Sequence, residues 1–192
     1  MTETKKSGGG QIIKLALVLL AVAAVIALVL GVVNEVTKGP IEQYLTAKRD
    51  AAYSQVMEGA ADYEELDAGS YANDPGNSIT KLSVAKDASG ETMGYVAETT
   101  FSGAQGMITM VIGLDNDLTC TGIGVTEHSE TSGLGAKAAD PTDPFPQSMV
   151  GVTDGMKLSK DGGSIAAISG ATLTSRAVVT EIQTVIDAVK SL

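Results

Sequence analysis

The residues best suited to chemistry lie near the C-terminus, in the run Ser169–Ser175, which reads SGATLTS. This run combines small residues with hydroxyl groups and leads into a predicted final helix from about Thr174. One interpretation is a plain helix start with Thr174 or Ser175 as N-cap. The other is a phosphate site, because a helix N-terminus offers unpaired N–H groups and partial positive charge. In that case the hydroxyl of Thr172 would lie beside the phosphate.

A second polar segment, His128–Lys137, reads HSETSGLGAK. It can be a polar loop with two turn glycines and a solvated lysine. Alternatively, the glycines expose backbone amides, while Glu130, Thr131 and Lys137 supply polar contacts to a planar ligand. Spacing alone favours the loop.

The same segment contains Gly133–Ala138, which fits the loose dinucleotide pattern G-x-G-x-x-A. A dinucleotide site needs a long helix after the glycines, and the three prolines that begin at Pro141 prevent one. The pattern is therefore not interpreted as a dinucleotide site.

Composition excludes several other classes. The chain has 192 residues and a formal net charge of −10, so the phosphates of nucleic acid would repel it. Its single Cys (Cys120) and single His (His128) cannot form an intrachain disulfide or a structural zinc site. A Ser-His-Asp or Cys-His hydrolase would depend on that one histidine. The sequence thus predicts no metal site and no catalytic triad.

The strongest physical signal is the apolar segment Leu15–Val33, whose 19 residues carry no charge. As a helix it would span about 28 Å, close to the thickness of a bilayer's hydrocarbon core. A cleaved signal peptide would have a shorter apolar run and a small-residue cleavage site, and neither is present here. We expect an uncleaved membrane anchor.

The charges on either side of this segment predict its orientation. Lys5, Lys6 and Lys14 precede it, whereas Lys38 beyond it is accompanied by Glu35 and other acidic residues. By the positive-inside rule, the N-terminus is expected in the cytoplasm and the C-terminal domain on the outer side of the membrane.

The remainder predicts one α+β domain. Gly39-Pro40 is expected to end the anchor and start a new helix through Met57, followed by an acidic surface loop at 58–77. Short β-branched runs with brief links predict antiparallel strands. These runs are Ile79–Ala85, Met93–Phe101, Met107–Leu114 and Leu118–Val125.

Beyond the strands, an irregular segment with three prolines extends to Pro146, and Ser164–Ile168 can be a further buried strand. The final helix has one apolar face. The expected organisation is a cytoplasmic tail (1–14), an anchor (15–33), a linker with a helix and acidic loop (34–77) and a cofactor-binding domain (78–192).

Taken together, the anchor, HSETSGLGAKA and SGATLTS resemble one family. The chain is similar to the FMN-binding domain of the G subunit of the Rnf electron-transport complex, which is related to the C subunit of the sodium-pumping NADH:quinone reductase. The family form of the first motif is H-x-E-T-P-G-L-G, and Ser132 stands here at the proline. In the family's extended second motif, D-x-x-[ST]-G-A-T, the aspartate falls on Ala166.

The resemblance implies that FMN is attached by a phosphoester bond to Thr172 and that a flavin transferase installs it. The other implied cofactor-binding residues lie in the two motifs. They are Glu130, Thr131, Gly133, Leu134, Gly135 and Lys137 in the first, and Ser169, Gly170, Ala171 and Thr174 in the second.

The function implied is that of an electron-carrying subunit in a membrane complex that couples ferredoxin:NAD⁺ oxidoreduction to Na⁺ or H⁺ translocation. Its partners would be the other membrane subunits, the flavin transferase and the lipid bilayer, and it would have no independent turnover. The alternatives are the flavin subunit of a sodium-pumping NADH:quinone reductase, and an anchored scaffold or binding protein without flavin, which Ala166 suggests.

Overall fold

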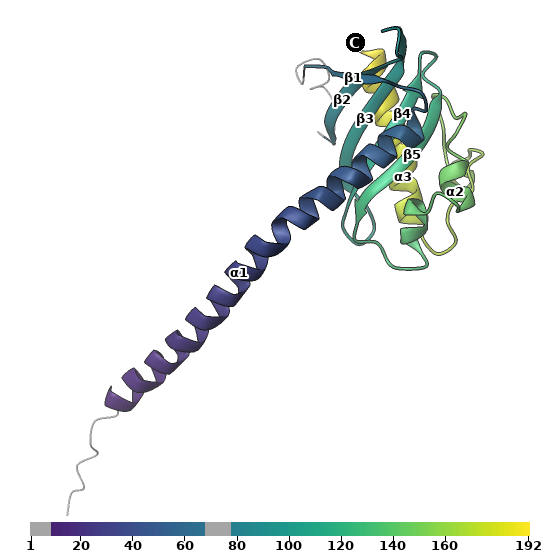
Figure 1. Ribbon diagram of the computed structural model, residues 1–192. Coiled ribbons are helices and arrows are strands. Elements are labelled where there is room, and N and C mark those ends of the chain that lie inside the picture. Colours follow the sequence, from purple (N-terminus) through teal and green to yellow (C-terminus); the bar gives the residue numbers. More distant parts are fainter. Residues whose placement is uncertain (1–8, 68–77) are drawn as a thin grey trace, which may run out of the picture. The chain divides into compact units, whose positions relative to one another are not determined.

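The computed structural model describes residues 9–67 and 78–192 (Figure 1). The chain divides into two compact units, Met1–Thr46 and Ala47–Leu192. Much of the expected tail and of the expected acidic loop lies outside the described residues.

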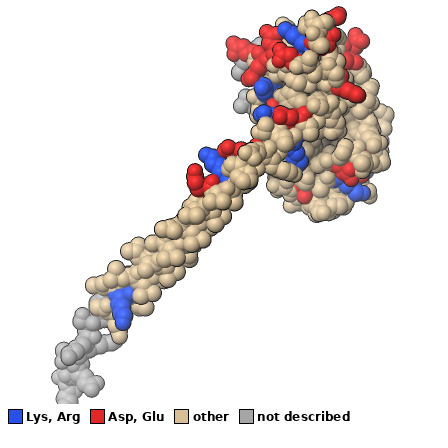
Figure 2. Space-filling view, in the orientation of Figure 1, with Lys and Arg blue, Asp and Glu red and all other residues tan. Residues whose placement is uncertain are grey.

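Helix α1, Gly9–Val56, contains the predicted anchor. By length and composition it can cross a membrane, and the apolar side chains of its first part are exposed. Figure 2 shows a basic residue near the start of the helix and then a long stretch without Lys, Arg, Asp or Glu. This is the segment in which the sequence predicts the membrane anchor.

The expected break at Gly39-Pro40 was wrong, because α1 continues through Pro40. Proline removes one backbone N–H, but its fixed φ suits a helix, and the following residues Ile41–Val56 are rich in good helix formers. One turn before the proline, the Thr37 hydroxyl donates to the Val33 carbonyl at 2.8 Å.

The second unit is built on a five-stranded antiparallel sheet in the order β1-β2-β3-β4-β5. The expected α+β fold with antiparallel strands and flanking helices is confirmed. The four predicted strands are present with slightly different ends. The strands are β1 (Asp62–Glu65), β2 (Ile79–Lys86), β3 (Thr92–Ser102), β4 (Met107–Asp115) and β5 (Cys120–His128).

Strand β1 falls in the segment expected to be loop, because its acidic sequence DYEE has no strand pattern. Its backbone pairs with β2, and the ring of Tyr63 packs edge-on against Tyr53 with the ring centroids 4.8 Å apart. Ion pairs of Lys81 with Glu65 at 3.1 Å and of Lys86 with Glu64 add to this pairing.

Helices cover both faces of the sheet (Figure 1). Helix α3, Thr172–Lys190, packs its apolar side against one face, with Val178 and Ile182 fully buried. The last turns of α1 pack against the other face, where Val56 contacts the surface around Val96 and Val111. Two glycines permit this close approach. A Cβ at Gly113 would lie 2.5 Å from the Val56 carbonyl oxygen, and one at Gly124 would lie 2.8 Å from the Cβ of Ala52.

Between β5 and α3 the chain forms only short helices: η2 (Gly135–Ala139), α2 (Pro144–Gln147) and η3 (Ser159–Asp161). The strand expected at Ser164–Ile168 was wrong. Its two buried residues, Ile165 and Ile168, are three apart rather than alternating, and only Ile165 makes a bridge, with Leu158.

Candidate functional site

The side chain of Glu130 joins three separate parts of the domain. The main-chain N–H groups of Ala104 and Gln105, in the turn between β3 and β4, donate to its Oε1 at 2.8 and 3.0 Å. The hydroxyl of Thr174, in the first turn of α3, donates to Oε2 at 2.6 Å. Glu130 is 8% exposed and Thr174 is fully buried. We call these four residues the carboxylate cluster. It links the two motifs that the sequence singled out.

Two glycines leave room for this carboxylate. A Cβ at Gly103 would lie 2.3 Å from Oε1 of Glu130, and one at Gly135 would lie 2.3 Å from Oε2 and 2.8 Å from the Thr174 hydroxyl. Any larger residue at either position would displace the carboxylate. Gly135 of the first motif and Gly103 in the turn between β3 and β4 therefore serve the packing of Glu130.

The pKa of Glu130 lies below its ordinary value. Burial acts to raise this pKa, but the hydrogen bonds from the Gln105 N–H, the Thr174 hydroxyl and the Ala104 N–H lower it by more, and the charge of His128 also lowers it. Glu130 is therefore an ionised acceptor at neutral pH.

The Thr172 side chain lies at the start of α3, half-buried. The ammonium group of Lys160, in η3, donates a hydrogen bond to its Oγ1 at 3.0 Å. The next residue, Leu173, is an exposed large apolar side chain. The arrangement presents a reachable hydroxyl with a cation beside it.

The other hydroxyls of the run have structural partners. Ser175 is fully buried; its Oγ accepts from the Ile168 N–H at 2.9 Å and donates to the Ala171 carbonyl at 2.9 Å. Thr174 donates to Glu130. The expectation that Thr174 or Ser175 caps the helix was wrong, since α3 begins at Thr172 and its N-cap, Ala171, makes no side-chain capping bond.

The backbone ahead of Thr172 turns sharply at Gly170, whose φ of +78° is in the left-handed region. A Cβ there would lie 3.0 Å from Cδ2 of Leu134, so the two motifs meet here a second time. Leu134 is 41% exposed, and Ser169 is exposed, while Ala171 is buried.

Other predicted residues lie at the edge of this group. Thr131, Gly133 and Lys137 are exposed. The Thr131 carbonyl accepts from the N–H of Leu134, which shapes the loop, and Gly133 has a φ of +74°.

Sequence reasoning missed Lys160 and the backbone donors Ala104 and Gln105. A lone lysine in the stretch Ser159–Asp161 carries no motif, and its approach to α3 depends on long-range folding. The glycines flanking the β3–β4 turn were the available signal for the other two.

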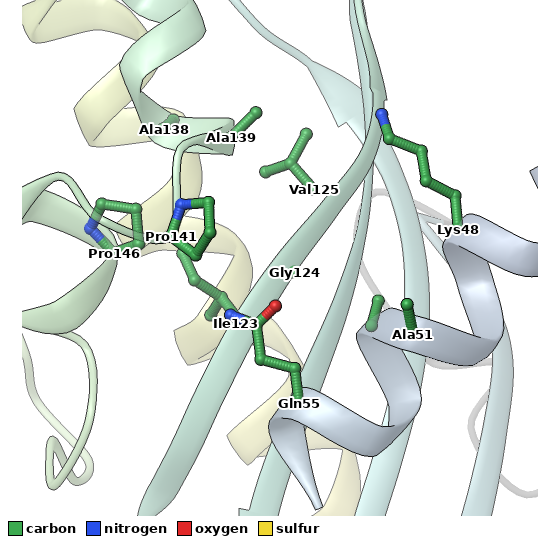
Figure 3. Close-up of a pocket in the computed structure, with 11 residues that line it drawn as sticks. Lys48, Ala51, Gln55, Ile123, Gly124, Val125, Ala138, Ala139, Pro141 and Pro146 are labelled. Atoms are coloured by element: carbon green, nitrogen blue, oxygen red, sulfur yellow. The ribbon is translucent and has the colours of Figure 1, made fainter.

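A separate cavity of about 160 Å³ lies beside β5 (Figure 3). Lys48 and Gln55 of α1 lie on one side of it, and Pro141 and Pro146 lie on the other. None of its lining residues belongs to the carboxylate cluster or to the Lys160–Thr172 pair.

Comparison with known proteins places these features in context. Residues 103–187 match the family model of the FMN-binding domain, a range that includes the carboxylate cluster, Lys160 and Thr172. The G subunit of the ion-translocating oxidoreductase complex of Methanosarcina acetivorans is 34% identical over 186 residues, 96% of this chain and 98% of the relative.

The G subunit of the Na⁺-translocating ferredoxin:NAD⁺ oxidoreductase complex of Acetobacterium woodii is 31% identical over 195 residues, 94% of this chain and 93% of the relative. Among solved structures, the crystal structure of Shewanella oneidensis NqrC matches with a TM-score of 0.45 and 24% identity, over 58% of this chain and 61% of that one.

Proposed function

The chain belongs to the family of G subunits of ion-translocating oxidoreductase complexes, and from this premise we propose that it carries electrons through an FMN attached to Thr172. When bound, FMN supplies electron transfer in one- or two-electron steps. The protein's contribution is to hold the flavin, tune its surroundings and keep it at the membrane.

The observation that carries the proposal is the pairing of Thr172 with Lys160. A phosphate esterified to Oγ1 would be bonded to an oxygen that lies 3.0 Å from an ammonium group. The residues present therefore fit the phosphate end of FMN, because a lysine ammonium stabilises an adjacent phosphate. The turn at Gly170 and the exposed Leu134 provide polar backbone and apolar surface next to the attachment point.

The state of neighbouring hydroxyls favours Thr172 as the attachment residue. Thr174 and Ser175 are fully buried and hydrogen-bonded, so neither can be modified without opening the domain. Ser169 is exposed and is the competing candidate.

The attachment step is a phosphoryl transfer. The Thr172 oxygen forms a bond to the flavin-side phosphorus of a flavin dinucleotide, the phosphoanhydride bond to that phosphorus breaks, and a nucleoside monophosphate leaves. The hydroxyl proton is released to the transferase or to solvent. Bonds form and break only at phosphorus and there is no oxidation or reduction, so the isoalloxazine ring is unaltered. The anhydride is needed because direct esterification in water would be unfavourable.

The membrane anchor sets the cellular context. We infer that the N-terminus lies in the cytoplasm and that the domain formed by residues 78–192 lies on the outer side of the cell membrane, from the lysines before the apolar stretch. The partners of the chain are then the other membrane subunits of the complex and, during maturation, the flavin transferase.

The proposal is tested by producing the full chain in membranes with a flavin transferase and measuring its intact mass. The wild-type chain should gain the mass of FMN minus water, Thr172→Ala should gain none, and Ser169→Ala should gain the wild-type increment. Bleaching of the flavin absorbance by dithionite, and its return in air, would show that the attached group accepts and releases electrons. A wild-type chain without added mass, or T172A with it, would refute the assignment.

A further inference from the structure

Resting on the proposed attachment to Thr172, we propose that Lys160 is the phosphate-binding residue of this site: it orients the Thr172 hydroxyl for modification and then neutralises the phosphoester. The carrying observation is the hydrogen bond from its Nζ to Thr172 Oγ1 at 3.0 Å. This oxygen is the atom that becomes the bridging oxygen of the ester. The ammonium group is consequently beside the phosphate as soon as the new bond forms.

The loop that carries Lys160 is anchored on both sides of it. Leu158 is 1% exposed and pairs with the buried Ile165, whose carbonyl accepts from the Ser159 N–H at 2.7 Å. Gly163 allows the chain to fold back, since a Cβ there would lie 2.0 Å from the Lys157 carbonyl oxygen. The loop conformation is therefore defined by burial and backbone bonds rather than by the lysine itself.

A second connection holds the loop to the helix that carries Thr172. Arg176, one turn further along α3, donates from Nε and from a terminal nitrogen to the two carboxylate oxygens of Asp161, at 2.9 and 2.8 Å. A bidentate pair of this kind fixes orientation as well as distance. Asp161 follows Lys160 directly, so the Asp161–Arg176 ion pair holds the lysine close to the first turn of α3.

The Asp161–Arg176 pair also determines which positively charged side chain can bind a phosphate at Thr172. Arg176 is engaged with Asp161, and its hydrogen bonds hold the pKa of that carboxyl below its ordinary value. Among the described residues, the Thr172 hydroxyl receives its side-chain hydrogen bond from Lys160 and not from the neighbouring Lys157.

For the transfer step, the lysine acts on charge and geometry. Its donated hydrogen bond engages one lone pair of Oγ1 and leaves the second free to attack the incoming phosphorus. Its positive charge stabilises the negative charge that gathers on the phosphoryl oxygens as the anhydride bond breaks. It takes no proton and exchanges no electron.

The test compares the initial rate of FMN attachment to the full chain at limiting flavin transferase, followed by intact mass. Lys160→Gln should be modified roughly three- to tenfold more slowly than the wild-type chain, because a charge-assisted hydrogen bond at an exposed site is lost. Lys160→Arg, which keeps charge and donors, should recover most of the rate. Lys157→Gln, the matched control on the same loop, should be modified at the wild-type rate.

The outcomes separate this inference from the attachment itself. Wild-type chain that takes up no flavin, or T172A that does, refutes the proposed function. If the wild-type chain takes up FMN and K160Q takes it up at the same rate, only the role of Lys160 is overturned. FMN attachment to K157Q as slow as to K160Q would also overturn that role, because it would indicate a general effect of charge. Attachment to K160R as slow as to K160Q would overturn it as well. The melting temperatures of unmodified wild-type chain, K160Q, K160R and K157Q should agree, since both lysine side chains are exposed.

Discussion

The hydroxyl of Thr174 donates a 2.6 Å hydrogen bond to Oε2 of Glu130, across 44 residues of sequence. This one bond ties the loop after β5 to the first turn of α3. Because Thr174 is two residues from Thr172, the position of the proposed attachment residue depends on the carboxylate that holds its neighbour. The carboxylate cluster is thus a structural support of the site.

Substituting Glu130→Gln should destabilise the domain. The amide oxygen can still accept from the Ala104 and Gln105 N–H groups, but the NH₂ group then faces the Thr174 hydroxyl, which must turn from donor to acceptor. The negative charge that strengthens all three hydrogen bonds is also lost. We expect a loss of about 2–4 kcal/mol and a melting temperature lower by roughly 5–10 °C. Thermal unfolding of the full chain in detergent measures this. Glu127→Gln, at an exposed position nearby, is the control and should melt like the wild-type chain. Equal melting of E130Q and wild-type would contradict the prediction.

The contribution of Glu130 should depend on pH in a definite direction. Its pKa in the folded protein is below the ordinary value of 4.5, so its ionised form is favoured by folding. That stability is fully present above pH 4.5 and is lost as pH falls through the lower pKa of the folded protein. The difference in melting temperature between wild-type and E130Q should be constant near neutral pH and shrink below about pH 4.5. A difference that persists unchanged to pH 3 would count against it.

A methyl group at Gly135 should disturb both partners of the same hydrogen bond. Gly135→Ala would place Cβ within 2.3 Å of Glu130 Oε2 and 2.8 Å of Thr174 Oγ1. We expect a loss of about 1–3 kcal/mol in the free energy of unfolding, and slower FMN attachment at Thr172. Gly122→Ala is a suitable control, because its Cβ would meet its neighbours at 3.5 Å or more. If G135A is no less stable than G122A, the close packing described here is incorrect.

The ion pair of Asp161 with Arg176 should matter for modification rather than for stability. Asp161→Asn removes the charge that holds the η3 loop to α3, so Lys160 is less often in place. We expect roughly two- to threefold slower FMN attachment, a smaller effect than that of K160Q, because the lysine itself remains. Asp154→Asn removes a similar exposed pair, with Lys190 at the other end of α3, and should leave the rate unchanged. Equal slowing by D154N would show that the effect is not local.

The alanine at position 166 should limit the rate of modification. It is exposed, so an aspartate there, as in the motif that this segment resembles, faces solvent and an approaching transferase. Ala166→Asp should attach FMN at least roughly twofold faster, by one added charge-assisted contact, with the melting temperature unchanged. Ser164→Asp adds the same charge at a nearby exposed position and should not accelerate attachment. If the two variants behave alike, the position of the charge has no importance.

Much of the fold could be predicted from local patterns. Alternating apolar residues located the four longer strands, and apolar spacing located α3, because each signal reports burial of one face. Strand β1 and the continuity of α1 through Pro40 could not be predicted. Strand β1 depends on backbone pairing with β2 and on the packing of Tyr63 against Tyr53, which are contacts distant in sequence. The continuity of α1 depends on the helix on both sides of Pro40.

The candidate site was predictable as two motifs but not as one arrangement. Glu130 and Thr172 were identified by the residues around them, and Glu130 was expected to contact a ligand. In the structure its two oxygens are occupied by Ala104, Gln105 and Thr174. Lys160 was not predicted, because its relation to Thr172 arises from the fold of the η3 loop and leaves no trace in sequence spacing.

The packing of the last turns of α1 on Gly113 and Gly124 determines where the chain can be truncated to release the domain from the bilayer. A cut made after Met57 would strip the cover from Val96 and Val111 and leave an apolar face open to water. A cut made ahead of Ala47 would retain that cover. The folded domain therefore begins before its first strand: the last turns of α1, from Ala47 on, are a part of the domain's own core.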